Sequence, residues 1–224
     1  IMHRLLHRNT AFWWNLIIIC VLLVSCGQKP AKISFAERKA LDSIISSSRN
    51  IDTLSVLQQR MEKEGNMLGS IIAYRLMGKE MRDDSQFDDA LRLHSEGLKQ
   101  AEALGDTLEI VQALNNIGTD YRRMGVFDLA QNYHYRAWAI SKDWRNESYD
   151  AKKNRMVSLN GLGNIYLTLG NYARADSALR MGLRAKRSCT AIWGRLSTTP
   201  ISALYSVIAA WLTRHGRISA SRWS

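Results

Sequence analysis

This 224-residue chain has few cysteines, few prolines and none of the short motifs typical of enzymes. The number and spacing of the three cysteines, Cys20, Cys26 and Cys189, do not indicate disulfide pairs, which excludes a disulfide-stabilised scaffold. No cluster of histidine and cysteine suggests a zinc site, and no phosphate-binding loop or nucleophile elbow is present. We therefore expect no catalytic residue, no metal and no cofactor. Only two prolines and few β-branched runs favour an all-α fold.

Acidic residues are missing from the whole C-terminal segment. Ser177–Ser224 contains eight lysines and arginines and no aspartate or glutamate, whereas the net charge of the entire chain is +11. The first 26 residues contribute two more arginines, so the central region between the two ends is close to neutral. A nucleic-acid-binding protein is expected to carry a basic patch on its folded domain. This distribution of charge argues against that function.

The N-terminus has the organisation of an export signal. A basic start is followed by an apolar run from Phe12 to Val24, interrupted by Asn15, which is short for a membrane span. The run ends in Leu23-Val24-Ser25-Cys26, which resembles a bacterial lipobox. The resemblance implies a lipoprotein signal over residues 1–26, lipid attachment at Cys26 and a tether over 27–34. We then expect a lipid-anchored protein of the cell envelope that faces the periplasm; an uncleaved N-terminal anchor is the alternative.

Three segments of the chain repeat the same spacing of small and aromatic residues. In each, a glycine is followed nine residues later by an aromatic residue and twelve residues later by an alanine. The three sets are Gly78, Phe87 and Ala90; Gly118, Phe127 and Ala130; and Gly163, Tyr172 and Ala175. Small side chains at fixed positions allow paired helices to approach closely. We expect helical hairpins in which each glycine lies against its alanine, and in which Gly125 and Gly170 end the first helix.

This pattern resembles the tetratricopeptide repeat family. The resemblance implies an antiparallel helix-hairpin α-solenoid, with about three repeats over residues 65–187. The first repeat departs from the pattern, with Met81 in place of tyrosine and Ser85 in place of glycine. The spacings of 40 and 45 residues exceed the usual repeat of about 34. We expect the five extra residues in the polar stretch Asp143–Lys153.

The segments on either side of the array have different characters. Residues 35–64 show helical apolar spacing over Phe35–Ser47 and Ile51–Lys63, which predicts a helical pair that caps the array. Residues 188–224 form an aberrant basic tail, with Ala203 and His215 where the spacing predicts a fourth glycine and alanine. Reading the codons one base out of register can restore both residues. We interpret the tail as a frameshifted fourth repeat; the alternative is a genuine basic tail, and resequencing the DNA distinguishes the two.

His94 and His134 lie 40 residues apart, at the same position of successive repeats. A catalytic pair is one interpretation. Because the separation equals the spacing of the repeat itself, we favour a repeated packing position.

The resemblance also implies a binding groove on the first helix of each hairpin. The family's groove positions lie three residues before the conserved glycine and one and four residues after it. They correspond here to Arg75, Lys79 and Arg82; to Asn115, Thr119 and Arg122; and to Asn160, Asn164 and Leu167. Arginine can bind a carboxylate with two parallel hydrogen bonds, and asparagine can pair with a peptide backbone. We expect a groove that binds an acidic segment of another protein; a solvated face without a ligand is the alternative.

Two functions other than catalysis fit this organisation. The first is a membrane-anchored scaffold that binds a peptide or a partner protein. The second is a truncated sensory input domain, because the lipobox and the segment Asn115–Gly125 resemble the extracytoplasmic repeat region of bacterial sensor proteins. A downstream reading frame that encodes a membrane span and a kinase would favour the sensor.

Overall fold

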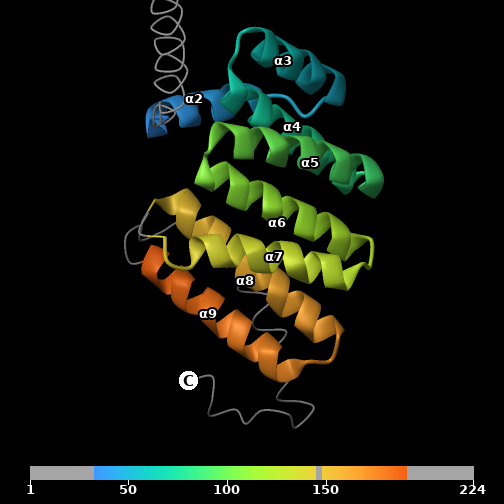
Figure 1. Ribbon diagram of the computed structural model, residues 1–224, viewed down its shortest axis with the longest axis vertical. Helices are drawn as coiled ribbons and strands as arrows, with labels where there is room; N and C mark the ends of the chain where they lie inside the picture. The colour runs from blue at the N-terminus through green and yellow to red at the C-terminus, as the bar shows by residue number, and fades with distance from the viewer. Residues whose placement is uncertain (1–32, 145–147, 191–224) are drawn as a thin grey trace, which may run out of the picture.

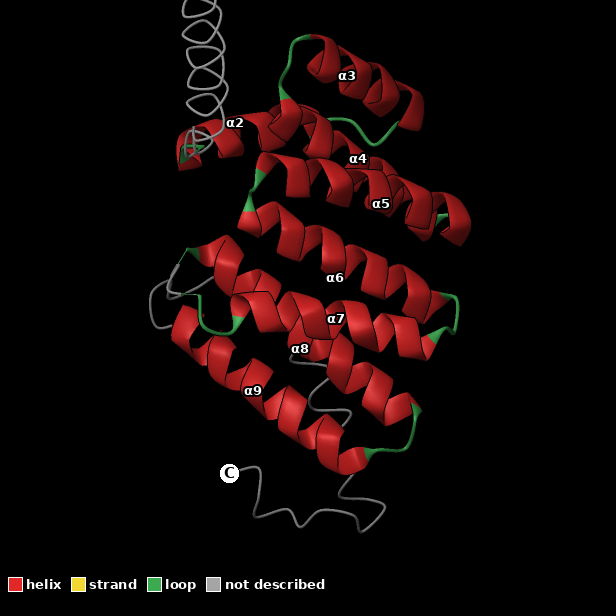
Figure 2. Ribbon diagram, viewed as in Figure 1, coloured by secondary structure: helices red, strands yellow, loops and turns green. Residues whose placement is uncertain are grey.

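Every regular element that the computed structural model describes, within residues 33–144 and 148–190, is an α-helix (Figure 2). The predicted all-α fold is therefore confirmed. The helices are α2 (Phe35–Ile45), α3 (Ile51–Lys63), α4 (Met67–Asp83), α5 (Phe87–Leu104), α6 (Thr107–Arg123), α7 (Phe127–Ser141), α8 (Tyr149–Thr168) and α9 (Tyr172–Thr190).

The helices form three hairpins stacked along the long axis of the molecule (Figure 1). Helix α4 pairs with α5, α6 with α7, and α8 with α9, and each hairpin packs against the next. The aromatic residue of each predicted repeat is the first residue of the second helix in its hairpin, at Phe87, Phe127 and Tyr172. The helical-hairpin solenoid expected from the sequence is the observed architecture.

The turns inside the hairpins use a left-handed residue, as the sequence predicts. Gly125 and Gly170 follow α6 and α8 with φ angles of +79° and +73°. Ser85, in the equivalent position after α4, has a φ of +63°, the only positive φ among the described non-glycine residues. The first repeat therefore adopts the same turn without the residue that favours it.

The repeated glycine of each hairpin leaves space for the residue sixteen positions later, whose side chain is its nearest neighbour. A Cβ atom added at Gly78 would lie 2.5 Å from Nε2 of His94. One added at Gly118 would lie 2.9 Å from Cδ2 of His134, and at Gly163 the neighbour is Leu179. The alanines of the three repeats are fully buried, but a larger side chain fills the space that the glycine leaves.

The five extra residues of the third repeat lie where the sequence predicts them. The connection between α5 and α6 is short, whereas α7 ends at Ser141 and α8 begins only at Tyr149. Helix α8 is also the longest of the described helices, at 20 residues. The insertion therefore lengthens the connection and the first turn of α8, and it leaves the hairpin contacts of Gly163 unchanged.

The two N-terminal helices do not form the expected pair. Helix α3 packs along α4, with Met61 against Gly69, as the second helix of a preceding hairpin would. Helix α2 also packs on α4 but not along α3; in Figure 1, α3 lies at the top of the stack and α2 to the left of α4. Ile45 of α2 and Leu54 of α3 join one apolar cluster with residues of α4.

Three predicted segments fall wholly or largely outside the described residues: the signal at 1–26 with Cys26, the tether at 27–34 and the tail at 188–224. Within the described ranges, no helix is both long enough and apolar enough to span a lipid bilayer.

Candidate functional site

The first helices of the three hairpins form the inner layer of the array. Helix α4 contacts α6, and α6 contacts α8, whereas no comparable contact joins α5 to α7 or α7 to α9. Helices that pack closely lie on the inside of a curved stack, so α4, α6 and α8 line its inner face. All the residues predicted to bind a partner lie on these three helices.

The basic residues of the first repeat are already neutralised. Arg75 forms an ion pair with Asp42 of α2. Lys79 Nζ lies 2.7 Å from Asp83 Oδ2, and the Arg82 guanidinium lies 3.0 Å from an oxygen of Asp120. These acidic residues of the chain itself neutralise the three positive side chains that the sequence predicts to bind a ligand.

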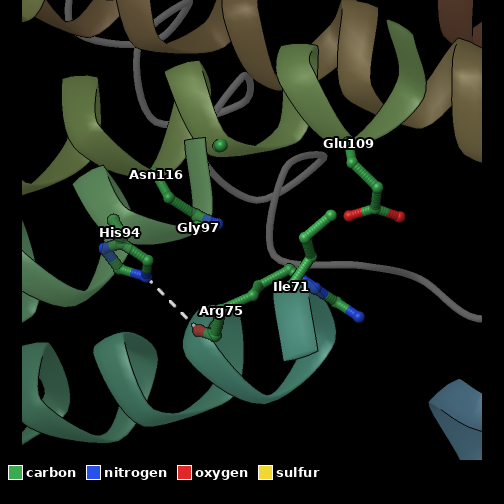
Figure 3. Close-up of a pocket in the computed structure, with 7 residues that line it drawn as sticks. Ile71, Arg75, His94, Gly97, Glu109 and Asn116 are labelled. Carbon is green, nitrogen blue, oxygen red and sulfur yellow. Dashed lines mark hydrogen bonds between the residues drawn. The ribbon is translucent and has the colours of Figure 1, made fainter. Parts of the chain in front are cut away.

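Asp120 links three helices through a buried hydrogen-bond network. Its side chain is completely buried on α6. One carboxylate oxygen accepts from Arg82 of α4, and the other lies 2.5 Å from Nδ1 of His94 on α5. The second ring nitrogen of His94 lies 3.3 Å from the backbone oxygen of Arg75 (Figure 3). These hydrogen bonds hold the first hairpin, α4 and α5, against α6 of the second hairpin. The role of Asp120 is therefore structural.

Asn115 is equally occupied in the second repeat. It is 2% exposed, and its side-chain NH₂ group donates to the backbone oxygen of Asn154 at 3.0 Å. Its side-chain oxygen accepts from Ser158 at 2.9 Å and lies 3.1 Å from Nδ1 of His134. The amide therefore joins α6, α7 and α8, and we leave Asn115 out of the binding surface proposed below. Thr119, half-buried, donates its hydroxyl to the backbone of Asn115.

His134 is held between two glycines of the inner layer. A Cβ atom at either Gly118 or Gly161 would overlap its ring. Burial lowers the pKa of His134 to about 4, and the positive charge of Arg122 acts in the same direction. The ring is therefore neutral near pH 7. With His94 under Gly78, this geometry favours the packing interpretation of the two histidines over a catalytic pair.

Arg122 differs from the other predicted arginines because no carboxylate of the described residues pairs with it. It is half-buried on α6. Burial lowers its pKa, and the positive charges of Arg123 and Arg82 act in the same direction. The internal repeat explains the difference. Arg82 is paired with Asp120, two residues after Gly118, whereas the equivalent residue after Gly163 is the buried Ile165.

Asn160 and Asn164 add amide groups one helix further along. They lie four residues apart on α8, so their side chains share one face of the helix. Both are half-buried, and the buried Oδ1 atom of Asn160 has no hydrogen-bond partner among the described residues. Leu167, also half-buried, continues the same helix. At the third repeat, the inner face therefore carries amide groups.

A cavity between α4, α5 and α6, lined in part by Ile71, Arg75 and Glu109, has a volume of about 10 Å³ (Figure 3). That is no more than about one water molecule requires. No group of three or more metal-binding side chains occurs in the described ranges.

The sequence could not reveal which cations were internally paired. The spacing of the repeats placed Arg75, Arg82 and Arg122 on equivalent faces of their helices. The only sequence signal for their difference is the exchange of Asp120 for Ile165 at equivalent positions. The position of α2 on the inner layer had no signal in the sequence.

Comparison with known proteins supports a fold of the tetratricopeptide type. The family model of the tetratricopeptide repeat matches residues 110–143. Among solved structures, BtubC from P. vanneervenii is similar with a TM-score of 0.54 and 20% identity, over 66% of this chain and 59% of BtubC. The apo form of RapI is similar with a TM-score of 0.53 and 15% identity, over 72% of this chain and 59% of RapI. The chain thus spans less than two thirds of either structure, and no curated protein sequence matches it.

Proposed function

We propose that this protein is a scaffold whose inner helix layer binds an acidic segment of a partner protein, and that it binds rather than catalyses. The observation that carries the proposal is Arg122, a half-buried guanidinium with positive neighbours and no internal carboxylate among the described residues. A buried or half-buried charge is stabilised by an opposite charge, and an arginine binds a carboxylate in a defined geometry.

The pair between Arg82 and Asp120 shows how such a carboxylate is held. In the first repeat the protein supplies the acid itself, with Asp120 Oδ1 at 3.0 Å from Arg82 Nη1. In the second repeat Ile165 replaces the acid, and a partner's aspartate, glutamate or C-terminal carboxylate would supply it. Asn164 and Asn160 are suited to donate to, and accept from, the partner's backbone.

Substitution of Arg122 tests this function. We would titrate a fluorescent peptide rich in glutamate against the full chain and against Arg122→Glu. Loss of a charge-assisted contact and the added repulsion should weaken binding at least about tenfold. Arg92→Glu is the matched control, because Arg92 is highly exposed on the second helix of its hairpin.

Equal affinity of the wild type and Arg122→Glu for this peptide would refute the proposal. Substitution of Arg75 or Arg82 is less suitable, because both form internal ion pairs whose loss changes stability. A peptide of the same length with glutamine in place of glutamate should bind weakly to every variant.

We further propose that Cys26 anchors this scaffold to a membrane of the cell envelope, with the array facing the periplasm. The lipobox-like sequence Leu23-Val24-Ser25-Cys26 supports it. Expression of the wild type and of Cys26→Ser in a bacterium fed a labelled fatty acid would test it. We expect label and membrane association only with Cys26 present; an equally labelled serine variant would refute the anchor.

A sensory input domain remains the alternative function. The feature that favours it is the likeness of the segment Asn115–Gly125 to sensor repeat regions. A downstream gene segment encoding a membrane span and a kinase would support this alternative, and a stop codon after a further repeat would support the scaffold.

A further inference from the structure

Helix α2 packs on α4 and covers part of the inner face. Asp42 of α2 pairs with Arg75 of α4, a residue that the sequence placed in the groove. Arg38 of α2 reaches further and pairs with Asp106 and Glu109 at the start of α6. Helix α2 therefore packs on α4 and is joined to α6 through the side chain of Arg38.

The sequence of α2 has the pattern of an amphipathic helix bound in a groove. Arg38 and Asp42 are four residues apart and therefore share one face. Leu41 and Ile45, three and seven residues after Arg38, pack into the apolar cluster that includes Ile72 of α4. The face of α2 that packs on the array thus carries two apolar residues beside one cation and one anion.

The receiving surface has the complementary charges. Asp106 and Glu109 face Arg38, and Arg75 faces Asp42. Glu109 is 3% exposed; burial raises its pKa, whereas the nearby positive charges of Arg75 and Arg38 lower it. A carboxylate buried in this way is stabilised by nearby cations, and Arg38 of α2 forms an ion pair with it.

The attachment of α2 is weaker than that of the other described helices. Only Ile45 of its eleven residues is buried, and Phe35 and Ile44 are 65% and 59% exposed. It forms no hairpin, and the connection Ser46–Asn50 to α3 contains three serines and no apolar residue. Little apolar area therefore opposes its release.

We propose that α2 is an internal occupant of a helix-binding site, and that a partner helix with the same pattern displaces it. The partner carries an arginine or lysine, an aspartate or glutamate four residues later, and leucine or isoleucine three and seven residues after the cation. This inference rests on the proposed function, because it assumes that the inner face binds a partner. It concerns the first repeat, whereas the acidic segment binds at Arg122.

A peptide that copies α2 tests the exchange. We would titrate a fluorescent peptide of residues 33–47 against the full chain and against its Asp42→Arg variant. Asp42 is about half exposed, and the substitution sets two cations against each other while leaving the receiving residues intact. Partial release of α2 should raise the apparent affinity for the peptide about tenfold. Asp88→Arg, on the exposed surface of α5, is the matched control.

Charge reversal on both sides gives a second measurement. A peptide carrying Asp42→Arg should bind poorly to the Asp42→Arg chain. It should bind well to a chain that keeps Asp42 and carries Arg75→Asp, because two carboxylates then repel each other in that chain and α2 is released. Hydrogen exchange of residues 35–45 should quicken in the Asp42→Arg chain and stay slow in Asp88→Arg.

Two outcomes would overturn the proposal. One is unchanged hydrogen exchange of α2 in the Asp42→Arg chain, which would make α2 a fixed part of the fold. The other is faster exchange without any gain in peptide affinity. Failure of the proposed function gives a different result: the glutamate peptide then binds the wild type and Arg122→Glu with equal affinity. The Arg122→Glu substitution leaves the α2 site intact.

Discussion

Single residues decide how well each repeat fits the common pattern, and Ser85 is the clearest case. It takes the left-handed conformation that glycine takes at Gly125 and Gly170. A residue with a Cβ atom is strained there by roughly 1–2 kcal/mol, and glycine costs roughly 0.5–1 kcal/mol in the unfolded chain. Ser85→Gly should therefore stabilise the protein by about 0.5–1 kcal/mol, measured by urea unfolding. Ser85→Ala is the control, and an equal gain from alanine would contradict the explanation.

The pH dependence of stability also depends on one residue, His134. Its pKa in the folded protein, about 4, is below the ordinary value of 6.5, so the unfolded chain binds more protons between these two values. The stabilisation is present above pH 6.5 and is lost as the pH falls towards 4, by about 3 kcal/mol in total.

Leucine at this position should remove that part of the pH dependence. Leu179 fills the same space in the third repeat, so His134→Leu is compatible with the packing. We expect the difference in unfolding free energy between pH 7 and pH 4.5 to shrink relative to the wild type. An unchanged difference would mean that His134 is not the group that titrates.

At the scale of helices, the buried carboxylate of Asp120 connects α4, α5 and α6. Asp120→Asn would leave Arg82 without its opposite charge in a mostly buried position. Breaking such a pair from one side costs about 3 kcal/mol, which denaturant unfolding would measure. Asp83→Asn breaks a pair with Lys79 that is about half exposed, and its cost should stay below about 1 kcal/mol. Similar losses from both variants would contradict the role of Asp120.

The helices themselves follow from local sequence, but their partners do not. The expected bounds of α3 and the ends of α6 and α8 at glycine agree with the structure, because caps and turns depend on neighbouring residues. The contact of Gly118 was predicted with Ala130, and the side chain nearest to Gly118 is that of His134. Both residues lie on the same face of α7, one turn apart, so the sequence spacing alone could not select between them.

At the scale of the whole molecule, stability should be local. Each described helix packs mainly against helices that are close to it in the stack, and no extensive contact joins α2 or α3 to α8 or α9. Leu54→Ala, at a fully buried residue of α3, should destabilise that end by about 2–5 kcal/mol. Hydrogen exchange should then quicken in α2, α3 and α4 and change little in α8 and α9.

The mirror variant provides the control for this prediction. Leu179→Ala, at the other end, should quicken exchange in α8 and α9 and leave α3 protected. Uniform acceleration along the chain in either variant would show that the array unfolds as one unit.

The sequence by itself determined the helices, their pairing into hairpins and the faces that point inward, because these depend on the 3.6-residue period and on residues close in the chain. Only the tertiary structure decided which charged side chains of those faces lack an internal ion pair and so remain available to a partner. Arg82 and Arg122 hold equivalent positions, four residues after a repeated glycine, and Arg75 shares the helix face of Arg82. Arg75 is paired by α2 and Arg82 by α6. Charge pairing joins residues 33 and 38 positions apart in these two cases, and no local pattern specifies contacts at that separation.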